Sequence, residues 1–322
     1  MSHMLKLLIV KTSSLGDVIH NLPIIHDIRT HYPDAEIDWV VEESFADIPK
    51  LHPGVNRVIP VALRRWRKAI FSKNTWSEIK AAKRSVSQQP YDVILDTQGL
   101  IKSGVITSMS YGHKHGFDKK SAREPLASHF YKTSHLVARN QHAVARIRTL
   151  AALSFGYPTP TDLPNYGIAA SAQPSLSLNA PYVVGLHGTS RDSKLWPVTH
   201  WVKLGMELAK LNLQLVLPWA STAEFQRAQQ IAGALNNAIV LPKQSIAQLA
   251  TIISQAQAAV GVDTGLSHLS VALSIPTVAI YTDTNPALTG VYAGAHAPAV
   301  NLGNINIIPE PIQVMDALKN IL

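Results

Sequence analysis

Residues 262–268, Val-Asp-Thr-Gly-Leu-Ser-His, follow a largely apolar run at 256–261 and precede a second apolar segment at 269–273. This pattern predicts a buried strand, a tight turn at Thr264 and Gly265, and then a helix. The first N–H groups of a helix lack intrahelical partners and lie at the positive end of its dipole, so such a turn suits a phosphate or another anion. An ordinary strand–helix connection with Asp263 as the helix N-cap is the alternative that the local pattern leaves open.

A second strand–turn–helix pattern lies near the start of the chain. An apolar strand is predicted at 5–10, followed by Lys-Thr-Ser-Ser-Leu-Gly-Asp at 11–17 and by apolar residues at roughly helical spacing from Val18 to Ile28. The pattern contains neither a Walker A loop nor a Gly-x-Gly-x-x-Gly fingerprint. Because each half of the chain has its own turn of this kind, we expect an α/β protein of two Rossmann-like domains whose parallel sheets face each other across a cleft.

Composition narrows the class of protein further. The 322 residues are enough for two domains, and a hydrophobic content of 46% indicates a globular chain. The absence of cysteine excludes a disulfide framework, a thiolate metal site and a thiol nucleophile. No apolar run reaches the roughly 18–20 residues that span a bilayer, and the N-terminal residues do not have the pattern of a signal peptide.

Strand and helix patterns alternate along both halves, which favours parallel sheets. The Pro-, Ser-, Asn- and Thr-rich stretch at 157–181 is the predicted linker zone. We place an N-terminal domain at 1–165 and a C-terminal domain at 166–308, with a closing helix at about 309–322 that could pack back on the N-terminal domain. Further strands are predicted at 37–41, 57–61, 91–96, 182–186, 214–218, 239–241, 258–262 and 277–281, and helices at 77–87, 100–110, 198–211, 223–235, 246–254 and 311–322.

The net charge of +8 is confined to the first half of the chain. Residues 1–165 carry 22 Lys and Arg against 14 Asp and Glu, whereas residues 166–322 carry seven of each kind. This asymmetry predicts a polyanionic partner for the first half and a small ligand for the second, with a solvated basic surface as the alternative. We do not expect nucleic acid as the partner, because the basic segments are few and no nucleic-acid-binding motif is present.

In the second half, polar residues follow the predicted strands. Ligands of an open α/β sheet bind beyond the carboxyl ends of its strands. Thr189, Ser190, Lys194, Glu224 and the 263–268 turn are therefore expected at one rim, where they suit a nucleoside diphosphate. Amides and hydroxyls would bind the phosphates, Lys194 would balance their charge, and Glu224 would bind ribose hydroxyls. A solvated position on a helix is the alternative for Glu224.

In the first half, Asp17 follows Gly16 at a predicted helix N-terminus. It is either a first-turn carboxylate that the helix dipole favours or a general base, and the dipole is expected to lower its pKa. The densest basic cluster is Arg-Arg-Trp-Arg-Lys at 64–68. Arginines in such a cluster either lie on a solvated face or bind carboxylates and phosphates in bidentate fashion.

Taken together, these motifs resemble those of the lipopolysaccharide heptosyltransferases, a family of GT-B glycosyltransferases. The resemblance extends from Leu5 to about Leu322, and its basic cluster and Arg-Glu-Pro-Leu-Ala segment favour the first enzyme of the series over the second. The segments that carry it are 11–17, 58–61, 64–68, 96–100, 122–128, 194–197 and 263–268.

The resemblance implies inverting transfer of L-glycero-D-manno-heptose from ADP-heptose to the Kdo sugar of Kdo2-lipid A, with no metal and no cofactor. It implies that Asp17 is the general base and that Lys194 stabilises the leaving ADP. The donor-binding residues implied are Thr189, Ser190, Lys194, Glu224, Gln244, Asp263, Thr264, Gly265 and His268. The acceptor-binding residues implied are Lys11, Ser13, Ser14, Arg64, Arg67 and Arg123. Gln244 departs from the family, in which an apolar residue is expected near the adenine.

The resemblance also implies a cytoplasmic protein, peripheral on the cytoplasmic face of the inner membrane. Its basic half would contact the anionic inner leaflet, where each Lys or Arg contributes about 1 kcal/mol. Two other interpretations stay open at this point. One is heptosyltransferase II or another GT-B sugar-nucleotide enzyme, and the other is a non-catalytic membrane adaptor that binds a nucleotide.

Overall fold

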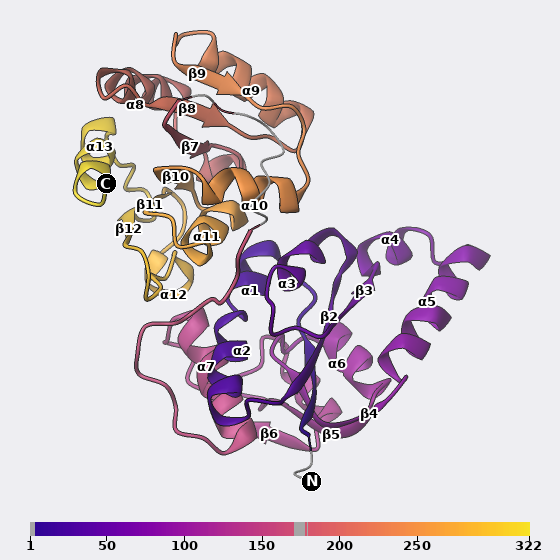
Figure 1. The fold of residues 1–322 in the computed structure, drawn as a ribbon. Helices are drawn as coiled ribbons and strands as arrows, with labels where there is room; N and C mark the ends of the chain where they lie inside the picture. Colours follow the sequence, from indigo (N-terminus) through magenta and orange to yellow (C-terminus); the bar gives the residue numbers. More distant parts are fainter. Residues whose placement is uncertain (1–3, 171–177, 179) are drawn as a thin grey trace. The chain divides into compact units, whose positions relative to one another are not determined.

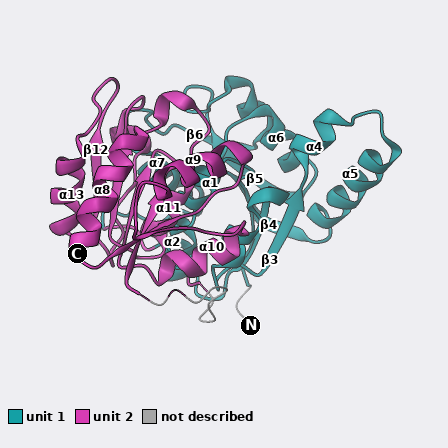
Figure 2. Cartoon of the chain, turned by 90° about the horizontal axis from the view of Figure 1, so that it is seen from above, with its two compact units in different colours: residues 1–162, 166–168 teal, residues 163–165, 169–322 magenta. Residues whose placement is uncertain are grey.

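The computed structural model describes residues 4–170, 178 and 180–322. The chain forms two compact units, residues 1–162 with 166–168 (unit 1) and residues 163–165 with 169–322 (unit 2), which Figure 2 distinguishes by colour. Of the predicted linker zone, residues 171–177 and 179 lie outside the described residues. No helix in the described part of the chain is long and apolar enough to cross a bilayer.

Unit 1 contains a six-stranded parallel sheet in the order β3-β2-β1-β4-β5-β6. In the central register Leu8 of β1 lies opposite Asp38 of β2 and Ile94 of β4. The strands are β1 (Lys6–Val10), β2 (Glu36–Glu42), β3 (Arg57–Val61), β4 (Pro90–Asp96), β5 (Tyr111–Phe117) and β6 (Thr133–His135). The helices are α1 (Leu15–Ile19), α2 (Pro23–His31), α3 (Asp47–Lys50), α4 (Leu63–Lys68), α5 (Lys73–Val86), α6 (Ile101–Ser108) and α7 (Ala143–Phe155), with 3-10 turns η1 (Glu43–Phe45) and η2 (Pro125–Phe130).

Unit 2 repeats this plan with a parallel sheet in the order β12-β11-β10-β7-β8-β9. Its strands are β7 (Tyr182–Leu186), β8 (Gln214–Leu217), β9 (Ala238–Val240), β10 (Ala258–Val262), β11 (Thr277–Tyr281) and β12 (Ala299–Gly303). Its helices are α8 (Val198–Lys210), α9 (Thr222–Ala232), α10 (Ile246–Ser254), α11 (Gly265–Ala272), α12 (Pro286–Thr289) and α13 (Pro311–Lys319), with the 3-10 turn η3 (Asp192–Lys194). Figure 1 shows both sheets with their flanking helices.

Each sheet has a topological switch point, where chain order reverses between neighbouring strands. In unit 1 the switch point lies between β1 and β4, and in unit 2 it lies between β7 and β10. The polypeptide leaves both strands of each pair at the same edge of the sheet because the strands are parallel. Ligands of open α/β sheets bind at such points. Both strand–turn–helix motifs of the sequence follow a strand of one of these pairs.

The α/β prediction with parallel sheets is confirmed, and every strand that we predicted is present. The prediction missed β5, β6 and β12. The sequences of β5 (Tyr-Gly-His-Lys-His-Gly-Phe) and β6 (Thr-Ser-His) are polar, and β6 and β12 are edge strands that are only partly buried. A strand that is not buried on both faces needs no continuous apolar run, so hydrophobic pattern alone does not reveal it.

The closing helix α13 packs in the core of unit 2. Its Val314, Met315 and Leu318 are fully buried in the same cluster as Trp196 and Trp201. The indole N–H of Trp196 also donates a hydrogen bond of 2.8 Å to the carbonyl of Pro309, just before the helix. The apolar face of α13 thus completes the cover of the sheet beside α8.

Two buried histidines make stability depend on pH. Burial lowers the pKa of His52 in unit 1 and of His187 in unit 2 to about 4 from the ordinary value of 6.5. Between these values the unfolded chain binds protons that the native chain does not, so the free energy of unfolding falls as the pH drops from 6.5 to 4. Each histidine contributes up to about 3 kcal/mol of this loss.

We therefore expect a lower urea midpoint at pH 4.5 than at pH 7. A His187→Asn variant should show a smaller decrease over this range, because it no longer has the group that takes up the proton. An equal decrease in the variant and the parent would contradict the assignment to His187.

Candidate functional site

The loop after β1 is fixed by the loop after β4 at the switch point of unit 1. The backbone N–H and the hydroxyl of Thr12 both donate to Gln98 Oε1, at 2.7 and 2.8 Å. Gln98 is itself positioned by its backbone N–H, which donates to the buried Asp96 at 2.8 Å. These bonds tie the start of the 11–17 segment to the loop after β4.

Asp17, in the first turn of α1 at the end of this loop, is an ionised carboxylate. One of its oxygens accepts hydrogen bonds from the backbone N–H and the hydroxyl of Ser14, at 2.9 and 2.7 Å. Burial alone would raise its pKa, but the charge of Lys11 and the two Ser14 hydrogen bonds outweigh that effect and lower the pKa to about 2. The direction agrees with the prediction. The cause is a lysine and a serine, since α1 is a single short helix of five residues.

Lys11 lies at the centre of a charged cluster in unit 1. Its side chain is buried, and its ammonium group donates to the carbonyl of Thr97 at 3.4 Å. Burial lowers the pKa of Lys11, while the carboxylates of Asp17 and Asp96 act in the opposite direction and the charge of Arg123 lowers it further. Because Lys11 lies between carboxylates and arginines, an anion bound beside it would change the pKa values of the groups in this cluster.

The cluster extends to α6 and α4 through Lys102. The Lys102 ammonium donates to the hydroxyl of Ser13 at 3.1 Å. Burial lowers the pKa of Lys102, Glu42 and Glu124 raise it, and the nearby charges of Arg64 and Arg123 lower it. Figure 1 shows α1, α3 and α4 along the same edge of unit 1. The structure thus brings together most of the predicted acceptor residues, namely Lys11, Ser13, Ser14, Arg64 and Arg123.

In unit 2, Asp263 connects three loops at the switch point. Its carboxylate accepts from the ammonium group of Lys194 and from the hydroxyl of Thr284, both at 2.6 Å. Its backbone carbonyl accepts from the hydroxyl of Thr189 at 2.8 Å. The Lys194 and Asp263 side chains are each only 13% exposed. Asp263 therefore orients a cation at the edge of the sheet.

The turn after β10 leads directly into α11, as the sequence predicted. Thr264 is the N-cap and Gly265 the first helical residue, so the alternative with Asp263 as the N-cap is wrong. The hydroxyl of Ser267 donates to the carbonyl of Val262 at 2.7 Å and ties the first turn to the strand. The first amides of α11 lie at the positive end of its dipole, beside the Asp263–Lys194 pair. His268 is buried in the same helix.

Glu224 lies against the loop after β7. One carboxylate oxygen accepts from the backbone N–H groups of Ala220 and Ser221, at 2.7 and 3.3 Å, in a capping box at the start of α9. A Cβ at Gly188 would lie 2.7 Å from the carboxyl carbon of Glu224, so only glycine permits this approach. Glu224 is half-buried in this position, where its carboxylate caps the start of α9.

Gln244 lies in the segment after β9, close to residues that follow β8. Its amide nitrogen donates to the carbonyl of Pro242 at 3.2 Å, and its side-chain oxygen is buried. The indole N–H of Trp219 donates to the carbonyl of Leu241 at 2.7 Å, and the ammonium of Lys243 lies 6.0 Å from the centre of the Trp219 ring. An aromatic face and an amide thus lie beyond the ends of β8 and β9.

Two predicted residues are not connected to these clusters. Ser190 is exposed beside Thr189, and Arg67 is exposed on α4. Three residues that the structure adds are Gln98, Lys102 and Thr284. Gln98 and Lys102 follow β4, which lies beside β1, and Thr284 follows β11, which lies beside β10. Because ligands bind at strand ends, these residues could have been predicted if the strand order had been known.

The chain resembles known proteins over nearly its whole length. Residues 79–310 match the model of glycosyltransferase family 9 (heptosyltransferase). Lipopolysaccharide heptosyltransferase 1 of Escherichia coli (strain K12) is 45% identical over 308 residues, which cover 94% of this chain and 97% of that protein. The structure of E. coli heptosyltransferase WaaC with ADP superposes with a TM-score of 0.91 at 41% identity, covering 99% of this chain and 100% of the other. The same enzyme with ADP-2-deoxy-2-fluoro heptose gives a TM-score of 0.86 at 42% identity, covering 98% of both chains.

Two six-stranded parallel sheets with flanking helices, matched at this level by WaaC, define a glycosyltransferase of the GT-B fold. The chain belongs to glycosyltransferase family 9, the heptosyltransferases.

Proposed function

We propose that this enzyme transfers L-glycero-D-manno-heptose from ADP-heptose to the Kdo sugar of Kdo2-lipid A, with inversion at the anomeric carbon and without a metal ion. The observation that carries the proposal is an ionised carboxylate, Asp17, which Ser14 holds in the first turn of α1 within range of the charge of Lys11. An inverting transfer needs one base for the acceptor hydroxyl and one cation for the leaving group. Asp17 and Lys194 are suited to these two tasks.

The C-terminal domain, placed at residues 166–308, binds the donor. The first amides of α11, at Thr264 and Gly265, take the diphosphate together with the Thr189 and Ser190 hydroxyls. Asp263 keeps Lys194 at the phosphates, with support from the Thr284 hydroxyl. Glu224 binds the ribose, Gln244 lies at the adenine, and His268 contacts the sugar.

The N-terminal domain, placed at residues 1–165, binds the acceptor. Kdo2-lipid A presents carboxylates and phosphates, and the excess of eight positive charges lies in this part of the chain. Arginine binds such groups in bidentate fashion and lysine binds them as a point charge. Lys11, Arg64, Arg67 and Arg123 supply these cations. The Ser14 hydroxyl donates to Asp17, and the Ser13 hydroxyl accepts from Lys102.

The chemical step moves one proton and one pair of electrons. The acceptor hydroxyl loses its proton to Asp17 while its oxygen forms a bond to the anomeric carbon. The bond from that carbon to the diphosphate oxygen breaks, and its electron pair leaves with ADP, where Lys194 balances the charge. Asp17 is a weak base at a pKa of about 2. An acceptor anion bound at Lys11 offsets the lysine charge and raises the basicity of Asp17 only when the acceptor is in place.

A Lys11→Met variant tests this coupling through the pH profile of kcat/KM. The acid limb of that profile reports the protonation of the general base in the free enzyme. Without the charge of Lys11, burial of Asp17 is less opposed and its pKa rises, so activity should fall on acidification to about pH 5, where the parent stays active. Lys11→Arg retains the charge and should keep the parent profile. Superimposable profiles for Lys11→Met and the parent would contradict the coupling.

We also propose a cytoplasmic location, peripheral on the cytoplasmic face of the inner membrane. The support is the chemistry of the acceptor, which is anchored in a bilayer, together with the basic character of the N-terminal half.

The direct test is incubation of the protein with ADP-heptose and Kdo2-lipid A, scored for ADP release. We expect release that depends on the acceptor. Binding of ADP without release would indicate a nucleotide-binding adaptor instead. Release only with an acceptor that already carries one heptose would indicate heptosyltransferase II.

A further inference from the structure

The segment that joins α4 to α5, residues 64–76, combines basic and apolar residues on the surface of unit 1. It contains five Lys and Arg and no Asp or Glu. Three of its large apolar side chains face solvent, Ile70 at 50%, Phe71 at 99% and Trp76 at 51% exposure. An exposed phenylalanine gains none of the hydrophobic free energy that burial would give. Exposed apolar residues that lie together therefore indicate a surface that binds another molecule or a membrane.

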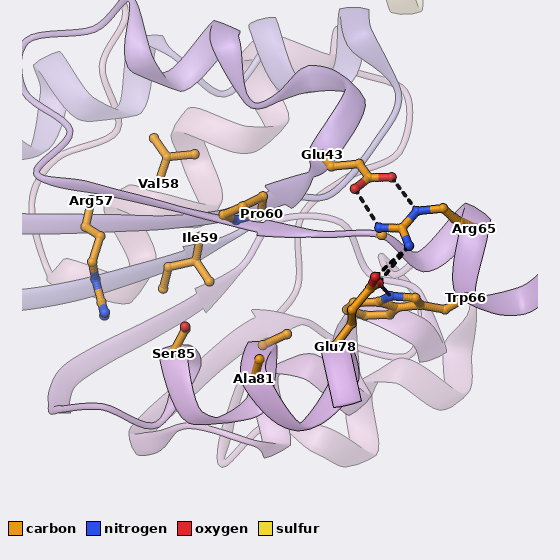
Figure 3. Close-up of a pocket in the computed structure, with 12 residues that line it drawn as sticks. Glu43, Arg57, Val58, Ile59, Pro60, Arg65, Trp66, Glu78, Ala81 and Ser85 are labelled. Carbon is orange, nitrogen blue, oxygen red and sulfur yellow. Dashed lines mark hydrogen bonds and ion pairs between the residues drawn. The ribbon is translucent and has the colours of Figure 1, made fainter. Parts of the chain in front are cut away.

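The segment is a fixed part of the fold. Figure 3 shows Arg65 between two carboxylates, Glu43 of η1 and Glu78 of α5. Arg65 donates to both oxygens of Glu43, at 3.1 and 3.0 Å, and to both oxygens of Glu78, at 2.9 and 2.8 Å. The indole N–H of Trp66 adds a bond of 2.6 Å to Glu78. Arg65 therefore fastens α4 to its neighbours and is not available to a ligand.

A further contact holds the tip of the segment. The indole N–H of Trp76 donates to the carbonyl of Ile70 at 2.9 Å. This bond joins the first turns of α5 to the connection and keeps Ile70 and Phe71 at its outer end. The connection lies at the far end of α4 and α5 in unit 1 (Figure 1).

The other cations of the segment stay available to a ligand. Arg67, Lys68 and Lys73 are exposed, and within residues 4–170, 178 and 180–322 none of them forms an ion pair. Arg64, at the start of the same segment, lies near Lys102 of the acceptor cluster. The exposed apolar residues therefore belong to a basic surface that is continuous with that cluster.

We propose that residues 64–76 dock this enzyme on an anionic phospholipid bilayer, with Ile70, Phe71 and Trp76 entering the headgroup region and Lys68 and Lys73 contacting phosphates. The cores of protein interfaces are depleted in charged residues, whereas basic residues beside exposed aromatic ones are typical of membrane-surface binding. The inference rests on the proposed function, since an acceptor anchored in the same bilayer would then lie beside Arg64.

The test measures sedimentation of the protein with vesicles of phosphatidylethanolamine and phosphatidylglycerol that contain no acceptor. We expect Phe71→Ser to lower the partition coefficient about tenfold, from the loss of aromatic burial. Lys68→Gln/Lys73→Gln should lower it about thirtyfold, since each cation near an anionic surface contributes about fivefold. Leu153→Ser, at a 46% exposed leucine of α7, is the matched control and should leave partitioning unchanged.

Equal partitioning of the parent and both segment variants would overturn the inference, and so would an equal loss in Leu153→Ser. Failure of the parent to bind phosphatidylglycerol vesicles would overturn it as well. None of these outcomes depends on heptose transfer. Transfer of heptose to a deacylated acceptor in free solution should be the same in Phe71→Ser and the parent. If the proposed function is wrong, the parent itself will show no transfer, whatever its binding to vesicles.

Discussion

An Asp17→Asn variant is expected to lower kcat by about 10³-fold, within the range that general-base catalysis contributes. Asparagine keeps the size of the side chain, and its oxygen can still accept the two hydrogen bonds from Ser14. It cannot accept the proton of the acceptor hydroxyl. Binding of ADP-heptose, measured by calorimetry, should be unchanged, because the residues that we propose bind the donor all lie in unit 2.

The matched control for this variant is Asp47→Asn. Asp47 is also a first-turn carboxylate, and it pairs with Lys50 at 3.4 Å on α3. If Asp17 were only a first-turn carboxylate, the two variants should behave alike and retain near-normal turnover, because each would lose about 0.3–1 kcal/mol of helix stabilisation. A large loss of kcat in Asp17→Asn with little change in Asp47→Asn distinguishes the catalytic role from the structural one.

Much of the fold could be predicted because the central strands are buried on both faces. Residues such as Leu7, Leu8 and Ile9 are fully buried, and a strand of this kind needs a continuous apolar run. The two turns could be identified for a related reason, since each lies between an apolar strand and a segment with helical spacing of apolar residues. The strands β6 and β12 escaped prediction because they are short or only partly buried and contain no continuous apolar run.

The site could be predicted only in part, because sequence gives the residues and not their partners. The lowered pKa of Asp17 was expected from a helix dipole, but the structure traces it to Lys11 and Ser14. Lys102 reaches Ser13 only because β4 lies beside β1 after a crossover. Thr284 reaches Asp263 for the same reason, across β10 and β11. Contacts between distant segments depend on strand order, which local pattern does not contain.

We expect a Lys194→Met variant to lower kcat by about 10²–10³-fold, which is the second large effect. The variant removes the cation that we propose balances the leaving diphosphate. It also leaves the carboxylate of Asp263 without its ion pair of 2.6 Å. That uncompensated charge should also weaken ADP binding. The matched control is Lys210→Met, which removes an exposed lysine paired with Glu207 at 2.6 Å and should change neither quantity.

The double variant Lys194→Met/Asp263→Asn separates the two consequences of losing Lys194. Neutralising Asp263 removes the repulsion between its carboxylate and the diphosphate, so ADP affinity should recover. The value of kcat should not recover, because the charge that develops on the departing ADP still has no cation beside it. Recovery of both quantities would mean that Lys194 only neutralises Asp263. In that case the amides at the start of α11 would be the groups that stabilise the leaving diphosphate.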